Sequence, residues 1–298
     1  MPEVSRRDQT LADRGRPTNA DSVARMRAWV NGKVLDDVDE PVLSVFDHGV
    51  TVGDGVFETV KSVAGQPFAL TRHLRRLDRS AQGLGLLPPA EERVRDAVAA
   101  VLEDSGDGVG RLRITLTGGP SPLGSDRGDA GPTLIVVAAG ETVWEAATAI
   151  ATVPWPRNER GALTGLKTTS YAENVVALAH AKRAGASEAI FSNTTGVLCE
   201  GTGSNIFYVV DGELITPTLA SGCLAGVTRA LVIEWCEARE RDAQADVLQR
   251  ADEIFLASTT RDVQPVRRCD ARDLSAPGPV TAEAQNTWAQ RSATDLDP

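Results

Sequence analysis

The sequence predicts a mixed α/β (α+β) protein with two domains. Its 298 residues are enough for one large domain or two moderate ones. Short runs rich in β-branched residues alternate with longer stretches of helical periodicity. We place a small N-terminal α/β domain at residues 26–140, a linker at residues 141–148 and a larger C-terminal domain at residues 149–298. Residues 1–25 are polar and aperiodic, and we expect them to form a disordered tail.

The composition is ordinary for a soluble globular protein, and we expect a cytoplasmic location. Hydrophobic residues make up 42% of the chain and charged residues 24%, which is ordinary for a globular protein. The net charge of −10 disfavours nucleic acid and anionic membranes as partners. No apolar run approaches the ~20 residues that span a bilayer, and no apolar signal core follows Met1. The four cysteines form no C-x-x-C pair, so we expect free thiols. The three histidines lack metal-ligand spacing, and we expect no metal site.

The N-terminal domain is expected to begin with a hairpin, because Asn31-Gly32 between two short apolar runs is typical of a type I′ turn. The glycine-rich stretch 42–55 has no regular pattern and leads into the next strand. Thr71 is the expected N-cap of the helix that follows. A Gly- and Pro-rich loop at 118–131 is expected on the substrate side. The regular elements are the hairpin at 27–35, strands at 56–63, 112–117 and 133–138, and helices at 71–81 and 89–104.

The C-terminal domain is expected to begin with a strand at 149–153 and to contain two hairpins. Its first helix, Ser170 to Ala184, is predicted to bury Val175, Leu178 and Ala179 and to end at Gly185. The other elements are strands at 188–192, 196–199, 205–210, 213–216 and 253–257, and helices at 226–238 and 281–292.

Lys167 stands out among the lysines of the chain. Lys33, Lys61 and Lys182 are expected to be solvated, whereas no charged residue lies within five positions of Lys167. A lysine in an uncharged pocket can lose its proton near neutral pH and act as a nucleophilic amine. The alternative is an ordinary lysine at the end of a strand.

Four blocks of the sequence occur in order: Gly53-Asp-Gly55 with Phe57-Glu58, Lys167 to Asn205, Ala225-Gly-Val-Thr-Arg229, and Ser258-Thr-Thr260. Together they make the chain resemble the class IV aminotransferases over about residues 27–268. That family includes branched-chain and D-amino-acid aminotransferases and 4-amino-4-deoxychorismate lyase. The resemblance implies pyridoxal 5′-phosphate, fold type IV with a larger barrel-like domain, and a homodimer in which the segment from about His48 to Phe57 closes the partner's pocket.

The same resemblance assigns roles to individual residues. Lys167 would hold the cofactor aldehyde as an imine and then move protons, and Glu200 would hold the pyridine nitrogen protonated. Arg76 would bind the phosphate, although with Arg72, Arg75 and Arg79 it also reads as part of a solvated basic face. Tyr171 is near where some family members place a tyrosine against the ring hydroxyl of the cofactor, but it stands one residue closer to the lysine than in the branched-chain enzymes. The other residues implied for the cofactor are Gly203, Ser204, Asn205, Val227, Thr228 and Thr260.

The substrate side departs from the family's patterns. The Arg that follows Ser-Pro in D-amino-acid enzymes is replaced by Leu123, and Arg127 is a possible substitute. Phe57, Glu58 and Thr259 are the other expected substrate-side residues. We expect an aminotransferase that passes the amino group of an amino acid to a 2-oxo acid, because Glu58 follows the aminotransferase pattern. The alternatives are a lyase that converts aminodeoxychorismate to 4-aminobenzoate and pyruvate, and a non-catalytic protein that binds pyridoxal phosphate.

Overall fold

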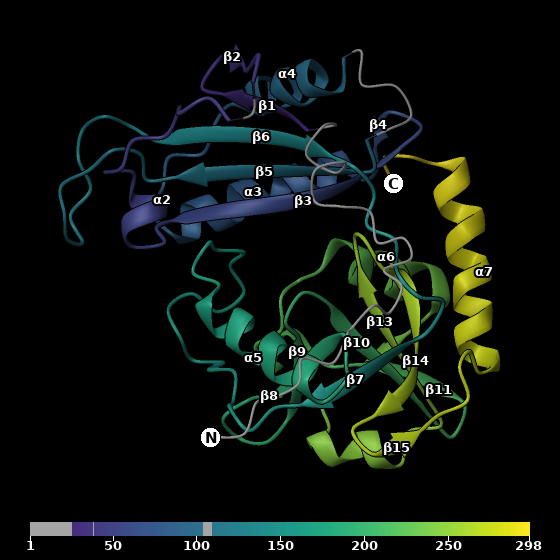
Figure 1. Cartoon of the computed structure of the whole chain (residues 1–298). Helices are drawn as coiled ribbons and strands as arrows, with labels where there is room; N and C mark the ends of the chain where they lie inside the picture. The colour runs from purple at the N-terminus through teal and green to yellow at the C-terminus, as the bar shows by residue number, and fades with distance from the viewer. Residues whose placement is uncertain (1–25, 38, 104–108) are drawn as a thin grey trace, which may run out of the picture.

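Two β-sheets, each formed by one half of the chain, organise the structure (Figure 1). The computed structural model describes residues 26–37, 39–103 and 109–298, so the predicted tail at 1–25 lies outside the described residues. The first sheet takes its strands from residues 27–139 and the second from residues 148–273. The predicted division into two domains at residues 141–148 stays a prediction.

The first sheet is antiparallel and, in the described part of the chain, has the order β2-β1-β6-β5-β3-β4. The hairpin of its first two strands turns at Asn31 and Gly32, whose φ angles of 47° and 108° are those of the predicted type I′ turn. The strands are β1 (Arg27–Val30), β2 (Lys33–Val34), β3 (Gly55–Val63), β4 (Gln66–Pro67), β5 (Arg111–Thr117) and β6 (Thr133–Ala139).

The two faces of this sheet differ in chemistry. Side chains alternate between the faces of a strand, and one face packs Val60, Ile114 and Val136 against helices α3 (Leu70–Gly83) and α4 (Glu91–Leu102). The other face lines a cavity between the sheets with Phe57, Thr59, Arg111, Arg113 and Val137. Strands β3, β5 and β6 therefore build the N-terminal core and one wall of the cavity at once.

Helix α3 begins differently from the prediction. Thr71 is not its N-cap, because the helix starts at Leu70 after Ala69, which has a φ of 53°. The amide and hydroxyl of Thr71 donate instead to the carboxylate of Asp297 at 2.8 and 2.5 Å. The C-terminal tail therefore supplies the acceptor for this helix end, and a local sequence pattern cannot reveal so distant a partner.

The glycine-rich segment before β3 contains a short helix, α2 (His48–Thr51), where the sequence predicted only irregular structure. Its N-cap is Asp47, whose carboxylate accepts from the Gly49 amide at 2.8 Å and from the hydroxyls of Thr117 and Thr133 at 3.0 and 2.9 Å. A buried carboxylate thus joins this segment to the ends of β5 and β6.

The second sheet has the order β12-β11-β10-β13-β14-β7-β8-β9 among the described residues, with β15 paired to β14. Strand β9 ends this order yet contacts β10 near the other end, so the sheet curls into the expected barrel-like form. The strands are β7 (Thr148–Thr152), β8 (Glu188–Ser192), β9 (Leu198–Gly201), β10 (Asn205–Val210), β11 (Glu213–Thr216), β12 (Arg239–Glu240), β13 (Glu253–Ser258), β14 (Asp262–Cys269) and β15 (Arg272–Asp273).

The central strand β14 was not predicted. It pairs antiparallel with β13 and parallel with β7, so it joins the two ends of the second half of the chain. Pro265 and the adjacent Arg267 and Arg268 break the apolar pattern by which strands are recognised. Because β14 lies between two other strands, most of its residues are buried, which its composition does not indicate.

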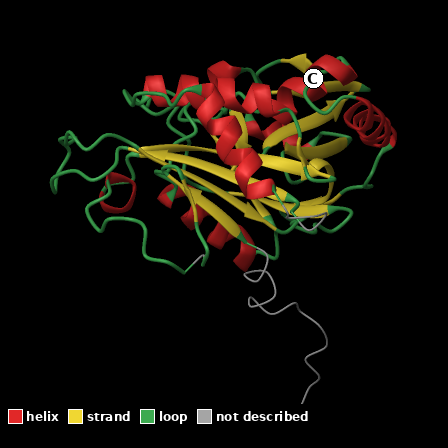
Figure 2. Ribbon diagram, turned by 90° about the horizontal axis from the view of Figure 1, so that it is seen from above, coloured by secondary structure: helices red, strands yellow, loops and turns green. Residues whose placement is uncertain are grey.

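Helices cover the outer faces of the second sheet (Figures 1 and 2). Helix α7 (Pro279–Thr294) packs on β13, β14 and α6 (Val227–Cys236). Helix α5 (Ala172–Arg183) packs on β7 and β8 through Asn174, Ala177 and Ala181. The predicted inward face was wrong, since Val175 is 63% exposed and Ala179 is exposed too. Small alanines let α5 approach the sheet closely, and its larger apolar side chains point outward. Within the described ranges, no helix has the length and apolarity to cross a membrane.

Candidate active site

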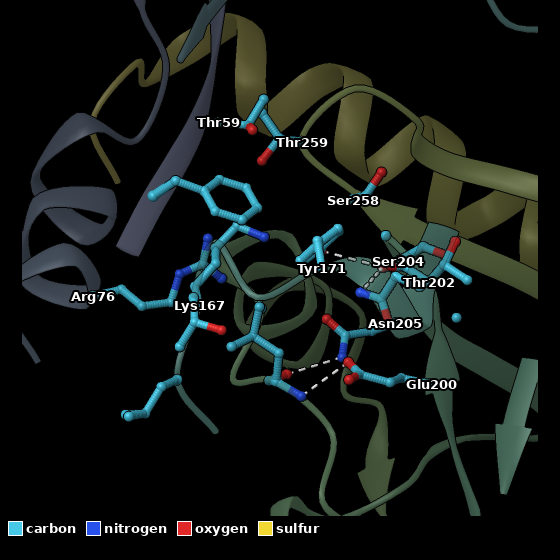
Figure 3. A pocket seen from close by; sticks show the side chains of 18 of the residues that line it. Thr59, Arg76, Lys167, Tyr171, Glu200, Thr202, Ser204, Asn205, Ser258 and Thr259 are labelled. Carbon is cyan, nitrogen blue, oxygen red and sulfur yellow. Dashed lines mark hydrogen bonds between the residues drawn. The ribbon is translucent and has the colours of Figure 1, made fainter. Parts of the chain in front are cut away.

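A cavity of about 870 Å³ lies between the two sheets, a size usual for small-molecule sites. Its walls are the polar face of β3 and β5, the segment 157–171, the loop 200–205, the start of α6 and the residues after β13. Figure 3 shows side chains from both halves of the chain converging there. The predicted site residues that line it are Phe57, Arg76, Lys167, Tyr171, Glu200, Gly203, Ser204, Asn205, Val227, Thr228, Thr259 and Thr260.

The backbone around Lys167 is fixed to the first sheet. The Phe57 amide donates to the Lys167 carbonyl at 2.9 Å, and the Thr169 amide donates to the Gly55 carbonyl at 2.8 Å. The Lys167 amide donates to the Ser80 hydroxyl on α3 at 3.2 Å. A Cβ atom at Gly55 would lie 2.8 Å from the Leu116 carbonyl oxygen, so glycine permits this close approach. These bonds hold the Lys167 side chain at the junction of the two sheets.

The charge environment of Lys167 is created by the fold. Its Nζ lies 4.3 Å from the centre of the Phe57 ring. Burial, then the nearby Arg76, lowers the pKa of this amine to about 8, while Glu58 opposes the shift. The residues next to Lys167 in the sequence are uncharged, but Arg76, Glu58, Arg113 and Glu200 surround it in space. The low pKa makes the unprotonated amine accessible near neutral pH.

The other lysines lie outside the cavity lining. Lys33 pairs with Glu40 at 2.6 Å on the surface, and Lys182 is exposed. Lys61 differs from the prediction of a solvated side chain, since it is only 28% exposed and pairs with Asp262 at 2.5 Å. That pair joins β3 to β14 and so connects the two sheets.

Glu200 presents a carboxylate to the same cavity. One oxygen accepts from the Leu224 amide at 2.9 Å, and the other lies 3.7 Å from the Nε of Arg157. Burial raises the pKa of Glu200 above its ordinary range, although Arg157 and the Leu224 amide act in the opposite direction. A cationic N–H group next to this carboxylate would stabilise its ionised form. A pyridinium nitrogen provides such a group.

Arg76 is buried, not part of a solvated basic face. Its Nε and Nη2 donate to the Glu58 carboxylate at 2.8 and 2.6 Å, and its Nη1 donates to the Ala225 carbonyl at 3.1 Å. His73 Nδ1 lies 2.7 Å from the same carboxylate. Burial alone would raise the pKa of Glu58, but Arg76 and His73 outweigh it and lower the pKa to about 2. A guanidinium has five N–H donors, so Arg76 retains donors for the cavity.

Glu58 does not reach the substrate side. Its carboxylate is fully buried between Arg76 and His73, and it is not among the residues that line the cavity. Strand alternation explains the placement, because Phe57 and Thr59 face the cavity while Glu58 faces α3. Glu58 therefore binds Arg76 and does not line the cavity.

Arg127 and its loop also lie away from the cavity lining. Its Nε and Nη2 donate to the Asp54 carboxylate, each at 2.7 Å, and further bonds run to the carbonyls of Leu84 and Gly85. The predicted loop at 118–131 is irregular, but none of its residues lines this cavity. Arg127 therefore does not line this cavity, and its role as a substitute for the missing carboxylate clamp stays a prediction.

The start of helix α6 offers an anion site. Gly226 is the N-cap, and no side chain caps the first turn, so its amides are free to bind a ligand. Val227 and Thr228 line the cavity there with Arg76 and Thr260. A Cβ atom at Gly226 would collide with the amide oxygen of Asn205, whose Nδ2 donates to the Leu224 carbonyl at 2.9 Å. Asn205 thus shapes the approach to the helix.

Polar bonds also fix the loop that follows Glu200. The Thr202 carbonyl accepts from the Tyr171 hydroxyl at 3.2 Å and from Asn174 at 3.0 Å. The buried Glu188 accepts from the Ser204 hydroxyl at 2.9 Å and from the Thr202 amide at 3.0 Å. Burial, then Glu200, raises the pKa of Tyr171, so this phenol stays a neutral donor.

The donor set fits pyridoxal 5′-phosphate. Lys167 offers an amine of lowered pKa. Glu200 offers a carboxylate that lacks a full cationic partner. The uncapped start of α6 offers an anion site beside Arg76. These three features lie around one cavity. Among the described residues, no cluster of three or more His, Cys, Asp or Glu is arranged to bind a metal ion.

Three arginines of the cavity escaped the sequence analysis, namely Arg111, Arg113 and Arg157. Arg157 Nη1 donates to Glu173 at 2.7 Å, and its guanidinium lies 4.2 Å from the Phe191 ring centre. Arg113 lies with its guanidinium 3.3 Å from the Phe57 ring centre. The alternation Arg111-Leu-Arg113-Ile could have indicated a basic face on this strand. No local signal indicates that Arg157 approaches Glu200.

Comparisons with known proteins agree on one group of enzymes. Residues 55–269 match the model of the amino-transferase class IV family. A putative branched-chain-amino-acid aminotransferase from Methanocaldococcus jannaschii is 35% identical over 84% of this chain and 90% of its own length. The fold IV transaminase CpuTA1 from Curtobacterium pusillum superposes with a TM-score of 0.79 at 31% identity over 89% of this chain and 99% of its own. The branched-chain aminotransferase from the thermophilic archaeon Thermoproteus uzoniensis, solved with norvaline, gives a TM-score of 0.81 at 27% identity over 89% and 94%.

The charges around Lys167 make its reactivity testable without cofactor. We expect competitive acetylation of the cofactor-free protein, followed by mass spectrometry across pH, to give Lys167 a midpoint near 8. Arg76→Met removes a nearby cation and should raise this midpoint by roughly one unit. Glu58→Gln removes an anion and should lower it. Arg79→Met, on an exposed position of the same helix, should leave it unchanged. A wild-type midpoint above 10, or no response to Arg76→Met, would contradict this account.

Proposed function

The chain belongs to the class IV aminotransferase family, and we propose that it transfers the amino group of an amino acid to a 2-oxo acid with pyridoxal 5′-phosphate as cofactor. The observation that carries the proposal is the placement of Lys167 and Glu200 on one cavity that also contains the uncapped start of α6. An amine, a carboxylate and an anion site are the three groups by which a protein holds this cofactor.

The residues would divide the work as follows. When bound, the cofactor supplies an aldehyde that accepts the amino group and a ring that withdraws electrons from the reacting carbon. Lys167 would hold the aldehyde and, once freed, take a proton from the substrate α-carbon, for which its pKa of about 8 is suitable. Glu200 would keep the ring nitrogen protonated. Val227, Thr228, Thr260 and Arg76 would bind the phosphate, with Glu58 fixing the guanidinium of Arg76.

The loop and helix around these groups would support them. Tyr171 donates to the Thr202 carbonyl and so holds the loop that carries Gly203, Ser204 and Asn205 beside Glu200. The Phe57 ring centre lies 4.3 Å from the Lys167 amine. Thr259 and Thr59, which both line the cavity (Figure 3), would face the substrate. These contacts exclude water from one side of Lys167 and leave an opening for the substrate.

We predict that borohydride reduction of the holoenzyme attaches the cofactor at Lys167, as peptide mapping would show. Lys167→Ala should lose the covalent attachment and at least about 100-fold of the activity while keeping the fold. Lys182→Ala, at an exposed position away from the cavity, is the matched control and should keep both. A reduced cofactor on Lys61 or Lys182 would refute the assignment of Lys167.

The reaction type is decided by a single turnover without an amino acceptor. We expect D- or L-amino acids to release one equivalent of 2-oxo acid per site and to abolish the absorbance band of the cofactor attached at Lys167. A lyase would keep that band and produce 4-aminobenzoate and pyruvate from aminodeoxychorismate. That outcome, with no 2-oxo acid from any amino acid, would replace the proposed transfer by the lyase reaction. Cofactor attachment with neither reaction would indicate a non-catalytic binding protein.

We further propose that the enzyme works as a homodimer through the segment before β3. Val45 and Val50 there are 76% and 65% exposed, and Leu123 on the adjoining loop is 75% exposed. The Ser121 amide donates to the Phe46 carbonyl at 3.0 Å, so the two segments form one apolar surface. A second copy covering this surface would remove it from water. The end of the predicted closing segment, Gly55 to Phe57, is bound to residues of its own chain, so the exposed Val50 and Val52 are the residues of that segment available to a partner.

Light scattering should therefore find a dimer, and Phe46→Asp, at a side chain 52% exposed, should yield monomers with little activity. Val143→Asp, at an exposed valine in the connection between the sheets, serves as the control and should stay dimeric. A fully active monomer at assay concentration would contradict the proposal.

The four cysteines are unpaired, and three of them are buried. Free thiols are typical of reducing compartments, which supports a cytoplasmic location for the enzyme.

A further inference from the structure

Arg261 does not line the cavity, but it belongs to a network of buried side chains behind two of the loops that do. We propose that Arg261 is a positioning residue, which pairs with the buried Glu188 and so holds the loop 201–205 and the turn 258–262 in place for the cofactor. This inference rests on the proposed function, because it concerns how the same cavity retains pyridoxal 5′-phosphate.

The turn between β13 and β14 brings Arg261 to this position. The Arg261 amide donates to the Ser258 carbonyl at 3.2 Å, and the next residue, Asp262, has a φ of 52°. Aspartate tolerates this left-handed conformation better than most residues do. Thr259 and Thr260 of the turn line the cavity, whereas the Arg261 side chain is only 4% exposed. The same turn therefore contributes two residues to the cavity and a buried cation to the wall behind it.

Four residues surround the guanidinium of Arg261. Its Nη1 donates to the side-chain oxygen of Gln264 and to the Ser187 hydroxyl at 3.3 Å, and its Nη2 donates to the Ser187 carbonyl at 3.1 Å. The guanidinium carbon lies 3.6 Å from the centre of the Trp144 ring. Nη2 also lies 3.8 Å from a carboxylate oxygen of Glu188. In the part of the chain that the structure describes, this is the one ion pair that Glu188 forms, so Arg261 is its counter-ion.

Glu188 connects Arg261 to the other loop. Its buried carboxylate accepts from the amide and hydroxyl of Thr202 and from the Ser204 hydroxyl. A Cβ atom at Gly201 would lie 3.0 Å from the Cγ of Glu188, so glycine permits this close approach. A buried carboxylate is costly unless it is both hydrogen-bonded and paired with a cation. Arg261 therefore allows Glu188 to serve as the common acceptor of this loop.

The loop 201–205 is the part of the cavity that a displacement of Glu188 would disturb. It directly follows Glu200 on β9, and its last residue, Asn205, lines the cavity. Asn205 donates to the Leu224 carbonyl at 2.9 Å, next to the start of α6. A shift of this loop would therefore reach both the carboxylate at the ring nitrogen and the anion site at α6. For this reason, we expect the loss of Arg261 to weaken retention of the cofactor.

Removal of one charge or of both charges tests this connection. Arg261→Met removes the cation and keeps the length of the side chain. Glu188→Gln removes the anion and keeps an oxygen that can accept from Thr202. The double variant has no buried charge at this position and should recover much of what Arg261→Met loses. Arg267→Met is the matched control, because Arg267 on β14 is 53% exposed and pairs with Glu145 at the surface.

The rate at which the holoenzyme loses pyridoxal 5′-phosphate on dilution is the first measurement. We expect Arg261→Met to raise this rate by roughly 10-fold or more, because it leaves a buried carboxylate without its counter-ion. The double variant should stay within about 3-fold of wild type, and Arg267→Met should match wild type. With saturating cofactor, kcat of Arg261→Met should remain within about 3-fold of wild type, since Lys167 and Glu200 are unchanged.

Amide hydrogen exchange of the same proteins reports on the loop without turnover. Arg261→Met should speed exchange in residues 201–205, where the Thr202 amide is bound by Glu188, and the double variant should restore protection. Unchanged exchange in Arg261→Met, or a double variant that loses the cofactor as fast as Arg261→Met, would overturn the inference. Where Arg261→Met does not fold, a folded double variant supports the inference and an unfolded one overturns it.

Failure of the proposed function would be distinguishable from failure of this inference. If exchange in residues 201–205 responds to Arg261→Met and recovers in the double variant while no amino group is transferred, the proposed function fails and the positioning role of Arg261 stands. If amino transfer is intact but neither exchange nor cofactor loss responds to Arg261→Met, the positioning role alone fails.

Discussion

The short pairing between β3 and the segment 167–169 is the interaction on which the rest of the site depends. Two backbone bonds, from Phe57 to Lys167 and from Thr169 to Gly55, join the first sheet to the second half of the chain. They place Lys167 between two walls that are built by separate sheets. The absence of a side chain at Gly55 permits this approach. Without the pairing, the amine would not lie at once beside Arg76 and opposite Glu200.

Several charges around the cavity are arranged as ion pairs. Glu58 neutralises Arg76, and Arg157 lies between Glu173 and Glu200. Removing one member of such a pair would leave an uncompensated buried charge, which is costly. Lys167 and Arg113 have no such direct partner among the described residues, and both face the Phe57 ring. Both therefore remain available to a ligand in the cavity.

Most regular elements were predicted from local patterns, and the errors share a cause. The hairpin at Asn31-Gly32, the strands around the cavity and the helix that starts at Gly226 have strong local signals. Strand β14 was missed because its charged residues interrupt the apolar pattern, although its central position in the sheet buries most of its residues. The buried face of helix α5 was predicted wrongly, because alanines and not valines contact the sheet. In each case a long-range contact outweighed the local preference.

The sequence by itself determined which chemical groups the site contains, because Lys167, Glu200 and the Gly226 helix start lie in recognisable blocks whose order follows the family. The resemblance also assigned Arg76 to the cofactor, and Arg76 lines the cavity. Only the tertiary structure decided the pKa shifts of those groups and which arginines of the cavity have no acidic partner. Glu58 and Arg127 were assigned to the substrate but are bound by other side chains, and Arg113 gave no motif. Hydrogen-bond partners and desolvation arise between residues far apart in the chain, so neither can be derived from the spacing of residues along it.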